Sequence, residues 1–170
     1  MTSDHTIPVD GPLPWTRACF VCGEENPRGF QLKMRAEAGR VVADYVTRDS
    51  DRGYSEIVHG GLMMTLLDEV MAWAAIVRAG RVCVAAEVTT RLKQPIGIGR
   101  TLRIEGEITN ARPRLLLAES RILGDDGELL LSGSGKYVPL EGTEADRFIE
   151  DFVSGGDAID PATLLHGSNA

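Results

Sequence analysis

Two short motifs in the middle of the chain carry groups that could do chemistry. The first is His59-Gly60-Gly61, which stands at the start of a long apolar segment. Two adjacent glycines let a ligand approach the backbone closely. If a helix begins here, its free N–H groups and the positive end of its dipole could stabilise a developing oxyanion. The simpler interpretation is a tight turn into a helix.

The second motif is Asp68-Glu69, inside that apolar segment. Burying a carboxylate is costly unless it is paired or hydrogen-bonded. Burial also raises the pKa of a carboxylic acid in general, which suits general-base catalysis near neutral pH. Adjacent residues of a helix point about 100° apart, so at least one of the two acids is expected to be structural. The alternative is an outward-facing polar patch or a structural hydrogen bond to a strand.

The spacing between the two motifs constrains how they could cooperate. Asp68 is the ninth residue after His59. In a regular helix this separation is about 900° of rotation and roughly 13.5 Å of rise, so the two side chains point to opposite sides. They cannot form a dyad within one chain. If both serve one site, two chains must build it, and a two-fold dimer would hold two such sites.

Hydrophobic periodicity predicts the elements that position these motifs. Residues 61–77 are apolar nearly all round and rich in helix formers, which predicts a helix buried on most sides and ended by Ala79-Gly80. Alternating segments predict strands at residues 31–37, 40–47, 82–92, 101–109, 115–123 and 128–138. Short links imply antiparallel pairing. The expected fold class is α+β, one long central helix wrapped by a curved antiparallel sheet of five to six strands.

The flanking segments lack this periodicity. Residues 1–18 are proline-containing and are expected to form an irregular lead-in to a domain at 19–139. Residues 48–58 are polar and contain glycine, which predicts a loop. From 141 to 160 the chain has seven acids and one base, so residues 140–170 are interpreted as an acidic tail. Within it we expect a short helix near 144–152 and loose chain beyond residue 154.

Size and charge limit the classes of function. A chain of 170 residues fits one domain with one core. Its net charge of −7 argues against nucleic acid as a partner, because phosphates require a basic footprint. Neither a signal peptide nor an apolar run of the roughly 20 residues that span a membrane is expected. The predicted location is therefore cytoplasmic, with no membrane partner.

Three cysteines raise the question of a metal. Cys19-Phe20-Val21-Cys22 is a C-x-x-C motif, and Cys83 stands alone. An odd number of cysteines in such a chain argues against a disulfide framework. A structural zinc site usually needs four ligands, no second pair follows, and the three histidines stand at no familiar spacing. We expect no metal and interpret the pair as packed thiols in a tight turn; a zinc site shared across a dimer is the alternative.

Taken together, the motifs resemble a known family. Val58-His59-Gly60-Gly61 followed by Leu66-Leu67-Asp68-Glu69 is similar to the hotdog-fold acyl-CoA thioesterases of the phenylacetate-pathway, PaaI-like branch. The resemblance covers about residues 19–139. Further matching segments are Cys19–Gly23, Asn26-Pro27, Gly29-Phe30 and Lys93-Gln94-Pro95. It implies hydrolysis of an acyl-CoA thioester to free CoA and a carboxylic acid, with no cofactor beyond the CoA of the substrate.

The resemblance also implies roles for the residues of both motifs. Asp68 would be the catalytic carboxylate, acting as general base on water or as a nucleophile that forms an anhydride. The amide of Gly60 or Gly61, supplied by the other subunit, would polarise the thioester carbonyl. His59 would help to position the thioester. The protein would then act as a homodimer or a dimer of dimers.

Further residues are expected to bind the acyl-CoA. Met64 and Ala72 lie on the predicted helix near Asp68, and methionines adapt to many acyl shapes. Met63, Met71 and Trp73 are expected to help form the acyl pocket. Arg91 and Lys93, at the end of a strand, are candidates for the CoA phosphates. The other candidate cations are Arg100, Arg112 and Arg114.

Two departures from the family pattern support a second hypothesis. Gly53 and Ala85 stand where many members carry polar residues, and Ser55, Glu56 or Thr89 could substitute for them. Their loss favours a non-catalytic acyl-CoA or acyl-carrier binding protein on the same scaffold, whereas Asp68 favours the enzyme. A hotdog dehydratase or hydratase is a weaker alternative, because those enzymes pair a histidine with an acid at other spacings.

Overall fold

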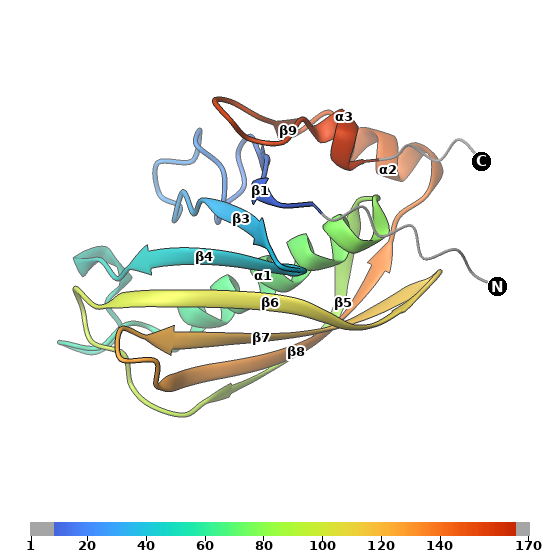
Figure 1. Cartoon of the computed structure of the whole chain (residues 1–170). Coiled ribbons are helices and arrows are strands. Elements are labelled where there is room, and N and C mark those ends of the chain that lie inside the picture. The colour runs from blue at the N-terminus through green and yellow to red at the C-terminus, as the bar shows by residue number, and fades with distance from the viewer. Residues whose placement is uncertain (1–8, 166–170) are drawn as a thin grey trace.

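The computed structural model describes residues 9–165, in which one antiparallel sheet curves around one long helix (Figure 1). The helix, α1, spans Gly60–Ala79. The sheet has seven strands in the order β1-β3-β4-β6-β7-β8-β5. They are β1 (Gly11–Pro12), β3 (Met34–Glu37), β4 (Arg40–Val46), β5 (Cys83–Leu92), β6 (Thr101–Arg112), β7 (Leu115–Gly124) and β8 (Leu129–Pro139). The predicted α+β class is confirmed, and so is each predicted strand.

The expected count of five to six strands is too low because β1 escapes detection by periodicity. It is two residues long and pairs with β3 at the edge of the sheet, so it carries no alternation. Pro12 is tolerated there because an edge strand has one side that needs no partner. The next residue, Leu13, is buried and donates its N–H to the Met34 carbonyl at 2.9 Å. The lead-in is therefore packed against the sheet from Gly11 onward.

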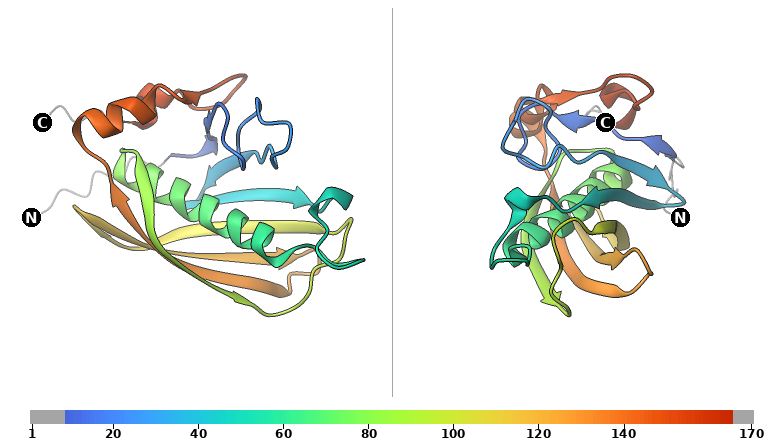
Figure 2. Two further views of the ribbon diagram at one scale, coloured as in Figure 1. Left: turned by 180° about the vertical axis from the view of Figure 1, so that it is seen from behind. Right: turned by 90° about the vertical axis from the view of Figure 1, so that its left-hand side faces the viewer.

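Helix α1 packs closely on the sheet. It ends at Gly80, whose φ of 63° is the left-handed conformation expected of a helix-ending glycine. A Cβ at Gly106 of β6 would lie 2.7 Å from the Val70 carbonyl oxygen, so only glycine lets the helix come this near. Figure 2 shows the sheet curving around the helix, which buries most of its apolar surface.

The same helix also passes a test for membrane spans by length and composition, which the sequence interpretation did not expect. It has 20 residues and a mean hydropathy of 1.4. Half of this window is buried inside the protein, and the helix contains both Asp68 and Glu69. A helix that is apolar on most sides because it packs in a protein core passes the same test.

The two flanking segments meet over the helix. Strand β2 (Trp15–Thr16) pairs with β9 (Phe152–Val153), and Figure 1 shows the blue and red segments lying together. The segment after β8 also forms α2 (Gly142–Ile149) and α3 (Pro161–Leu164). Leu164 and Leu165 are buried, so the expectation of loose chain beyond residue 154 is wrong as far as residue 165. The short helix expected near 144–152 is α2, which begins and ends slightly earlier.

Candidate functional site

The N-terminal end of α1 is shaped by His59. This residue is the N-cap, and its Nδ1 accepts the Gly61 N–H at 3.1 Å. That hydrogen bond occupies one of the two amides expected to face a substrate. Among the described residues, the Gly60 N–H has no acceptor. Gly60, rather than Gly61, therefore offers the free donor.

The loop before the helix fixes the backbone of His59 by a hydrogen bond and by close packing. The His59 N–H donates to the Asp51 carbonyl at 2.8 Å. The Asp51 carboxylate is buried and accepts the Tyr45 hydroxyl and the Arg48 N–H. A Cβ at Gly53 would lie 3.0 Å from the His59 Cα. Packing therefore explains why position 53 is a glycine, because a larger residue there would press on the backbone of His59.

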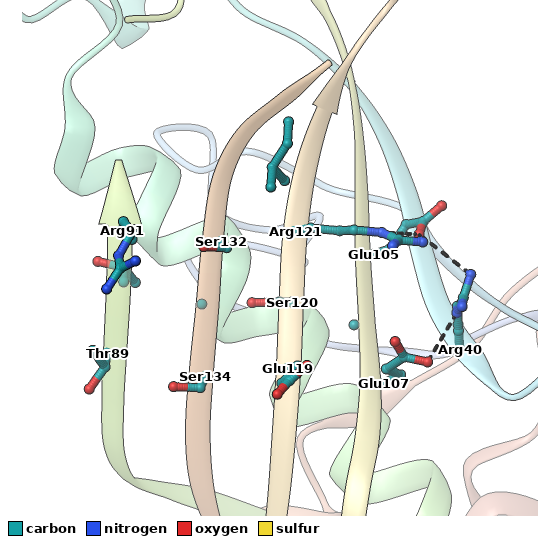
Figure 3. A pocket seen from close by; sticks show the side chains of 14 residues that line it. Arg40, Thr89, Arg91, Glu105, Glu107, Glu119, Ser120, Arg121, Ser132 and Ser134 are labelled. Atoms are coloured by element: carbon teal, nitrogen blue, oxygen red, sulfur yellow. Dashed lines mark hydrogen bonds and ion pairs between the residues drawn. The ribbon is translucent and has the colours of Figure 1, made fainter. Parts of the chain in front are cut away.

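The residues proposed as substitutes for the missing polar groups lie elsewhere. Ser55 and Glu56 are exposed in this loop. Thr89 points to the face of the sheet opposite the helix (Figure 3). Ala85 is directly paired with Tyr137 of β8, so the two side chains share the helix face of the sheet. None of the three substitutes is placed beside Asp68.

Asp68 is held by a residue that the sequence analysis missed. The Tyr137 hydroxyl lies 2.7 Å from Asp68 Oδ1 and 3.2 Å from the Asp68 carbonyl oxygen. Tyr137 is fully buried, while Asp68 is half-buried. Burial, and then the neighbouring Asp68 carboxylate, raise the pKa of the Tyr137 hydroxyl far above its ordinary value, so it stays protonated and donates.

A glycine provides the signal that could have indicated Tyr137. A Cβ at Gly135 would lie 2.6 Å from the Tyr137 ring. The two residues alternate on the same face of β8, so Gly135 makes room for an inward-facing aromatic ring. The glycines of this strand predicted a close approach, but periodicity could not name the helix residue that the ring reaches.

Glu69 has separate surroundings, as the 100° rule predicts. Its Oε1 accepts the Trp73 indole N–H at 3.0 Å and lies 3.8 Å from the Cys19 Sγ. Burial raises the pKa of the Glu69 carboxyl above its ordinary value, with a further contribution from the neighbouring Cys19. Glu69 therefore faces the N-terminal segment, whereas Asp68 faces β8.

Met64, Asp68 and Ala72 share one face of α1, because they stand at four-residue intervals. All three are half-buried. A cavity of about 480 Å³ lies beside Ala72. Its apolar lining includes Trp73, Ile76, Val82, Val84, Phe148 and Phe152. Met63 and Met71 are fully buried in the core and do not line this cavity.

The end of β5 reaches the N-terminal end of the helix. A Cβ at Gly60 would lie 2.8 Å from the Leu92 Cδ2, so Arg91 and Lys93 flank a residue that packs on the helix start. Both cations are exposed, and neither forms an ion pair with any described residue. Arg100, in contrast, pairs with Asp125 and Glu128.

Arg91 lies on the outer face of the sheet, turned away from α1 (Figure 3). Its side chain is therefore not directed at Asp68 of the same chain. A depression of about 490 Å³ on this face also contains Glu105. The buried Glu105 carboxylate accepts hydrogen bonds from Arg103 at 2.7 Å and Arg121 at 2.8 Å. Burial opposes ionisation of Glu105, but these arginines outweigh it and hold its pKa below the ordinary value.

Comparison with known proteins places this arrangement in a family. The model of the thioesterase superfamily matches residues 56–131, which include the His59 motif, Asp68 and the edge strand β5. The matched segment is that of the thioesterase superfamily, and the fold around it is the hotdog fold of PaaI-type thioesterases. A comparison with curated proteins gave no match.

Solved structures agree with this assignment. The PaaI protein of the phenylacetic acid degradation operon of E. coli has a TM-score of 0.61 and 20% identity, over 67% of this chain and 83% of PaaI. A thioesterase superfamily protein, RHA08564, has a TM-score of 0.66 and 25% identity, over 72% of this chain and 63% of that one. A Streptococcus mutans UA159 protein bound to acetyl-CoA has a TM-score of 0.60 and 18% identity, over 64% of this chain and 88% of that one.

Proposed function

We propose that this thioesterase-superfamily protein hydrolyses an acyl-CoA thioester to free CoA and a carboxylic acid. The observation that carries the proposal is the Asp68 carboxylate, half-buried on α1 and fixed by the Tyr137 hydroxyl at 2.7 Å. The Tyr137 donor restricts the rotation of the carboxylate. Asp68 would activate water as a general base or attack the carbonyl as a nucleophile. No cofactor beyond the CoA of the substrate takes part.

The free Gly60 N–H of a second subunit would complete the site. In one chain, Asp68 lies more than two turns along the helix from Gly60, so a single thioester cannot touch both. A preorganised amide at the start of a helix is suited to stabilise the oxyanion that forms on the thioester carbonyl. His59 would orient the backbone amides of Gly60 and Gly61, because its Nδ1 already accepts the Gly61 N–H.

Strand β5 offers the surface for that second subunit. It is the last strand of the sheet order and spans ten residues, Cys83–Leu92. Val84, Val88 and Leu92 are exposed by 36% to 49%. A long apolar edge with unpaired backbone groups favours pairing with another chain. A homodimer joined at β5 would extend the sheet and bring α1 of each chain beside the other.

Two features would recognise the substrate. The apolar cavity beside Ala72 fits an apolar or aromatic acyl group, and Met64 lies on the same helix face. Arg91 and Lys93 carry no ion-pair partner among the described residues, so they remain available for the CoA phosphates. The acetyl-CoA bound to the Streptococcus mutans protein supports CoA as the ligand of this fold.

The test is free-thiol release from a panel of short-chain, medium-chain, long-chain and aryl acyl-CoAs. We expect turnover in the wild type and its loss in Asp68→Asn. The matched control is Glu105→Gln, which neutralises another buried carboxylate on the opposite face of the sheet. It should cost stability and keep turnover. Turnover that survives Asp68→Asn would overturn the assignment of the catalytic carboxylate.

A non-catalytic acyl-CoA or acyl-carrier binding protein is the second candidate. The observation that favours it is that, within residues 9–165, Tyr137 is the only side chain hydrogen-bonded to Asp68, since Ala85 and Gly53 offer no polar group. Tight acyl-CoA binding by calorimetry, together with no thiol release from any member of the panel, would establish this function and exclude the hydrolase.

A further inference from the structure

The C-x-x-C motif meets a carboxylate from the core helix. Cys19 Sγ lies 3.8 Å and 4.0 Å from the two carboxylate oxygens of Glu69. One ligand atom each from Cys19, Cys22 and Glu69 falls within 4.8 Å of the others. All three cysteines of the chain are free thiols. Two thiols and a carboxylate in one place form a donor set suited to a borderline-soft divalent cation.

The turn that carries the thiols is held by backbone N–H groups and by a glycine. The Val21 N–H donates to the Cys19 Sγ at 3.3 Å, and the Gly23 N–H donates to the Cys19 carbonyl at 3.0 Å. A Cβ at Gly23 would lie 2.5 Å from the Cys19 nitrogen, so the turn requires glycine there.

The Glu69 carboxylate has no cationic partner among the described residues. Glu69 is held by the Trp73 indole and the thiols, and no described basic residue forms an ion pair with it. An isolated buried anion is costly. A thiolate at Cys19 beside it would add a second negative charge. A divalent cation between them would remove both costs at once.

We propose that Cys19, Cys22 and Glu69 form a site for a divalent cation of the Zn²⁺ class. With Zn–S of about 2.3 Å and Zn–O of about 2.0–2.2 Å, tetrahedral ligands lie roughly 3.5–3.8 Å apart. The separation of 3.8 Å between Cys19 Sγ and Glu69 Oε1 is close to this range, and all three ligand atoms lie within 4.8 Å of one another. Binding would release the thiol protons, since the thiolate is the ligand form.

The proposed ion would link the N-terminal segment to the core helix. Cys19 and Cys22 belong to the segment that precedes β3, and Glu69 lies in the middle of α1. Three protein ligands leave a fourth coordination position. Cys19 and Glu69 both line the cavity beside Ala72, so water can reach this position from there. Asp68 faces Tyr137 and is not a ligand of this site, whereas Cys19 and Glu69 border the same cavity that would receive the acyl group.

The experiment is a Co²⁺ titration of the full chain, fully reduced and stripped with a chelator, followed by absorbance. Thiolate ligands give Co²⁺ a near-ultraviolet charge-transfer band, which carboxylates alone do not. We expect one equivalent to bind, with the band displaced by Zn²⁺. Cys19→Ser and Cys22→Ser should lose the band, and Cys83→Ser, which removes the remaining thiol, should keep it. Glu69→Gln should keep the band while weakening binding about tenfold or more.

Three results would overturn the proposal. The first is that the reduced wild-type protein, with a native circular dichroism spectrum, shows no charge-transfer band. The second is that Cys19→Ser shows the same band as the wild type. The third is that Glu69→Gln binds Co²⁺ with unchanged affinity. If a cysteine variant does not fold, Glu69→Gln and the rise in wild-type Tm on adding Zn²⁺ decide the question. Acyl-CoA turnover is not a readout here, so this test is independent of the proposed hydrolase.

Discussion

Replacing Tyr137 with phenylalanine isolates the hydroxyl that fixes the proposed catalytic carboxylate. The ring of Tyr137 is fully buried and packs where Gly135 leaves room for it. Phenylalanine keeps the ring, so the core should stay intact. The variant loses only the donor that lies 2.7 Å from Asp68 Oδ1 and 3.2 Å from the Asp68 carbonyl.

The size of the effect follows from the nature of this hydrogen bond. A bond to a charged group contributes about 1.5–3 kcal/mol. Asp68 is half-buried, so water can replace part of it, and we expect Tyr137→Phe to lose about 1–2 kcal/mol of unfolding free energy. If the hydroxyl restrains the carboxylate in the transition state, the same bond energy of about 1–2 kcal/mol corresponds to a fall in kcat of about fivefold to thirtyfold.

The assay combines chemical denaturation with thiol release from the best acyl-CoA of the panel. Ile122→Val is the stability-matched control: Ile122 is fully buried in β7, and this truncation costs about 0.5–1.5 kcal/mol without touching a polar group. It should keep wild-type kcat. The reasoning about Tyr137 is refuted if Tyr137→Phe keeps wild-type kcat, or if Ile122→Val loses as much activity.

Three further predictions concern charge and assembly. The folded-state pKa of Glu105 lies below its unfolded value. Its ionised carboxylate therefore stabilises the fold above about pH 4.3, and this contribution is lost as the pH falls through the folded-state pKa. Glu105→Gln should have a lower free energy of unfolding than the wild type at pH 7, and the two values should converge as denaturation is measured at lower pH. Val88→Lys, on the exposed edge strand, should give monomers by light scattering and abolish turnover, whereas Val46→Lys, at a valine that is 55% exposed on β4, should stay dimeric. Gly60→Pro, which removes the free amide at a helix position that accepts proline, should be inactive, with Gly60→Ala as the control that keeps the amide. Mixed dimers of Gly60→Pro and Asp68→Asn should regain turnover at one of their two sites, and no gain on subunit exchange would contradict a site shared between chains.

Much of the fold could be predicted because its elements obey strong periodicities. The six alternating segments became strands, and the block at 61–77 became α1, since each pattern matches the burial of one face or of all faces. The flanks were misjudged for a physical reason. Strands of two residues, such as β2 and β9, have no period, and their stability comes from tertiary contacts such as Trp73 against Phe152, whose ring centres lie 5.5 Å apart.

The site was predictable only where its residues are neighbours in sequence. The start of α1 at the His59-Gly60-Gly61 motif and the divergence of Asp68 and Glu69 follow from spacing and helix geometry alone. The identity of each acid's partner does not, because Tyr137 and Cys19 come from distant segments that only the tertiary fold brings to α1. Periodicity also could not show that His59 would occupy the Gly61 amide, since that depends on the rotamer of its side chain.

The separate partners of Asp68 and Glu69 give the central helix two different roles. Asp68 meets a neutral donor, Tyr137, which can hold a carboxylate while leaving its second oxygen free for chemistry. Glu69 meets two thiols and an indole, a set with no cation of its own among the described residues. A carboxylate that must react needs access, whereas one that binds a metal needs converging ligands. Asp68 and Glu69 are adjacent on α1 and point about 100° apart. One acid is therefore accessible beside β8, while the other lies among the converging ligands of the N-terminal segment.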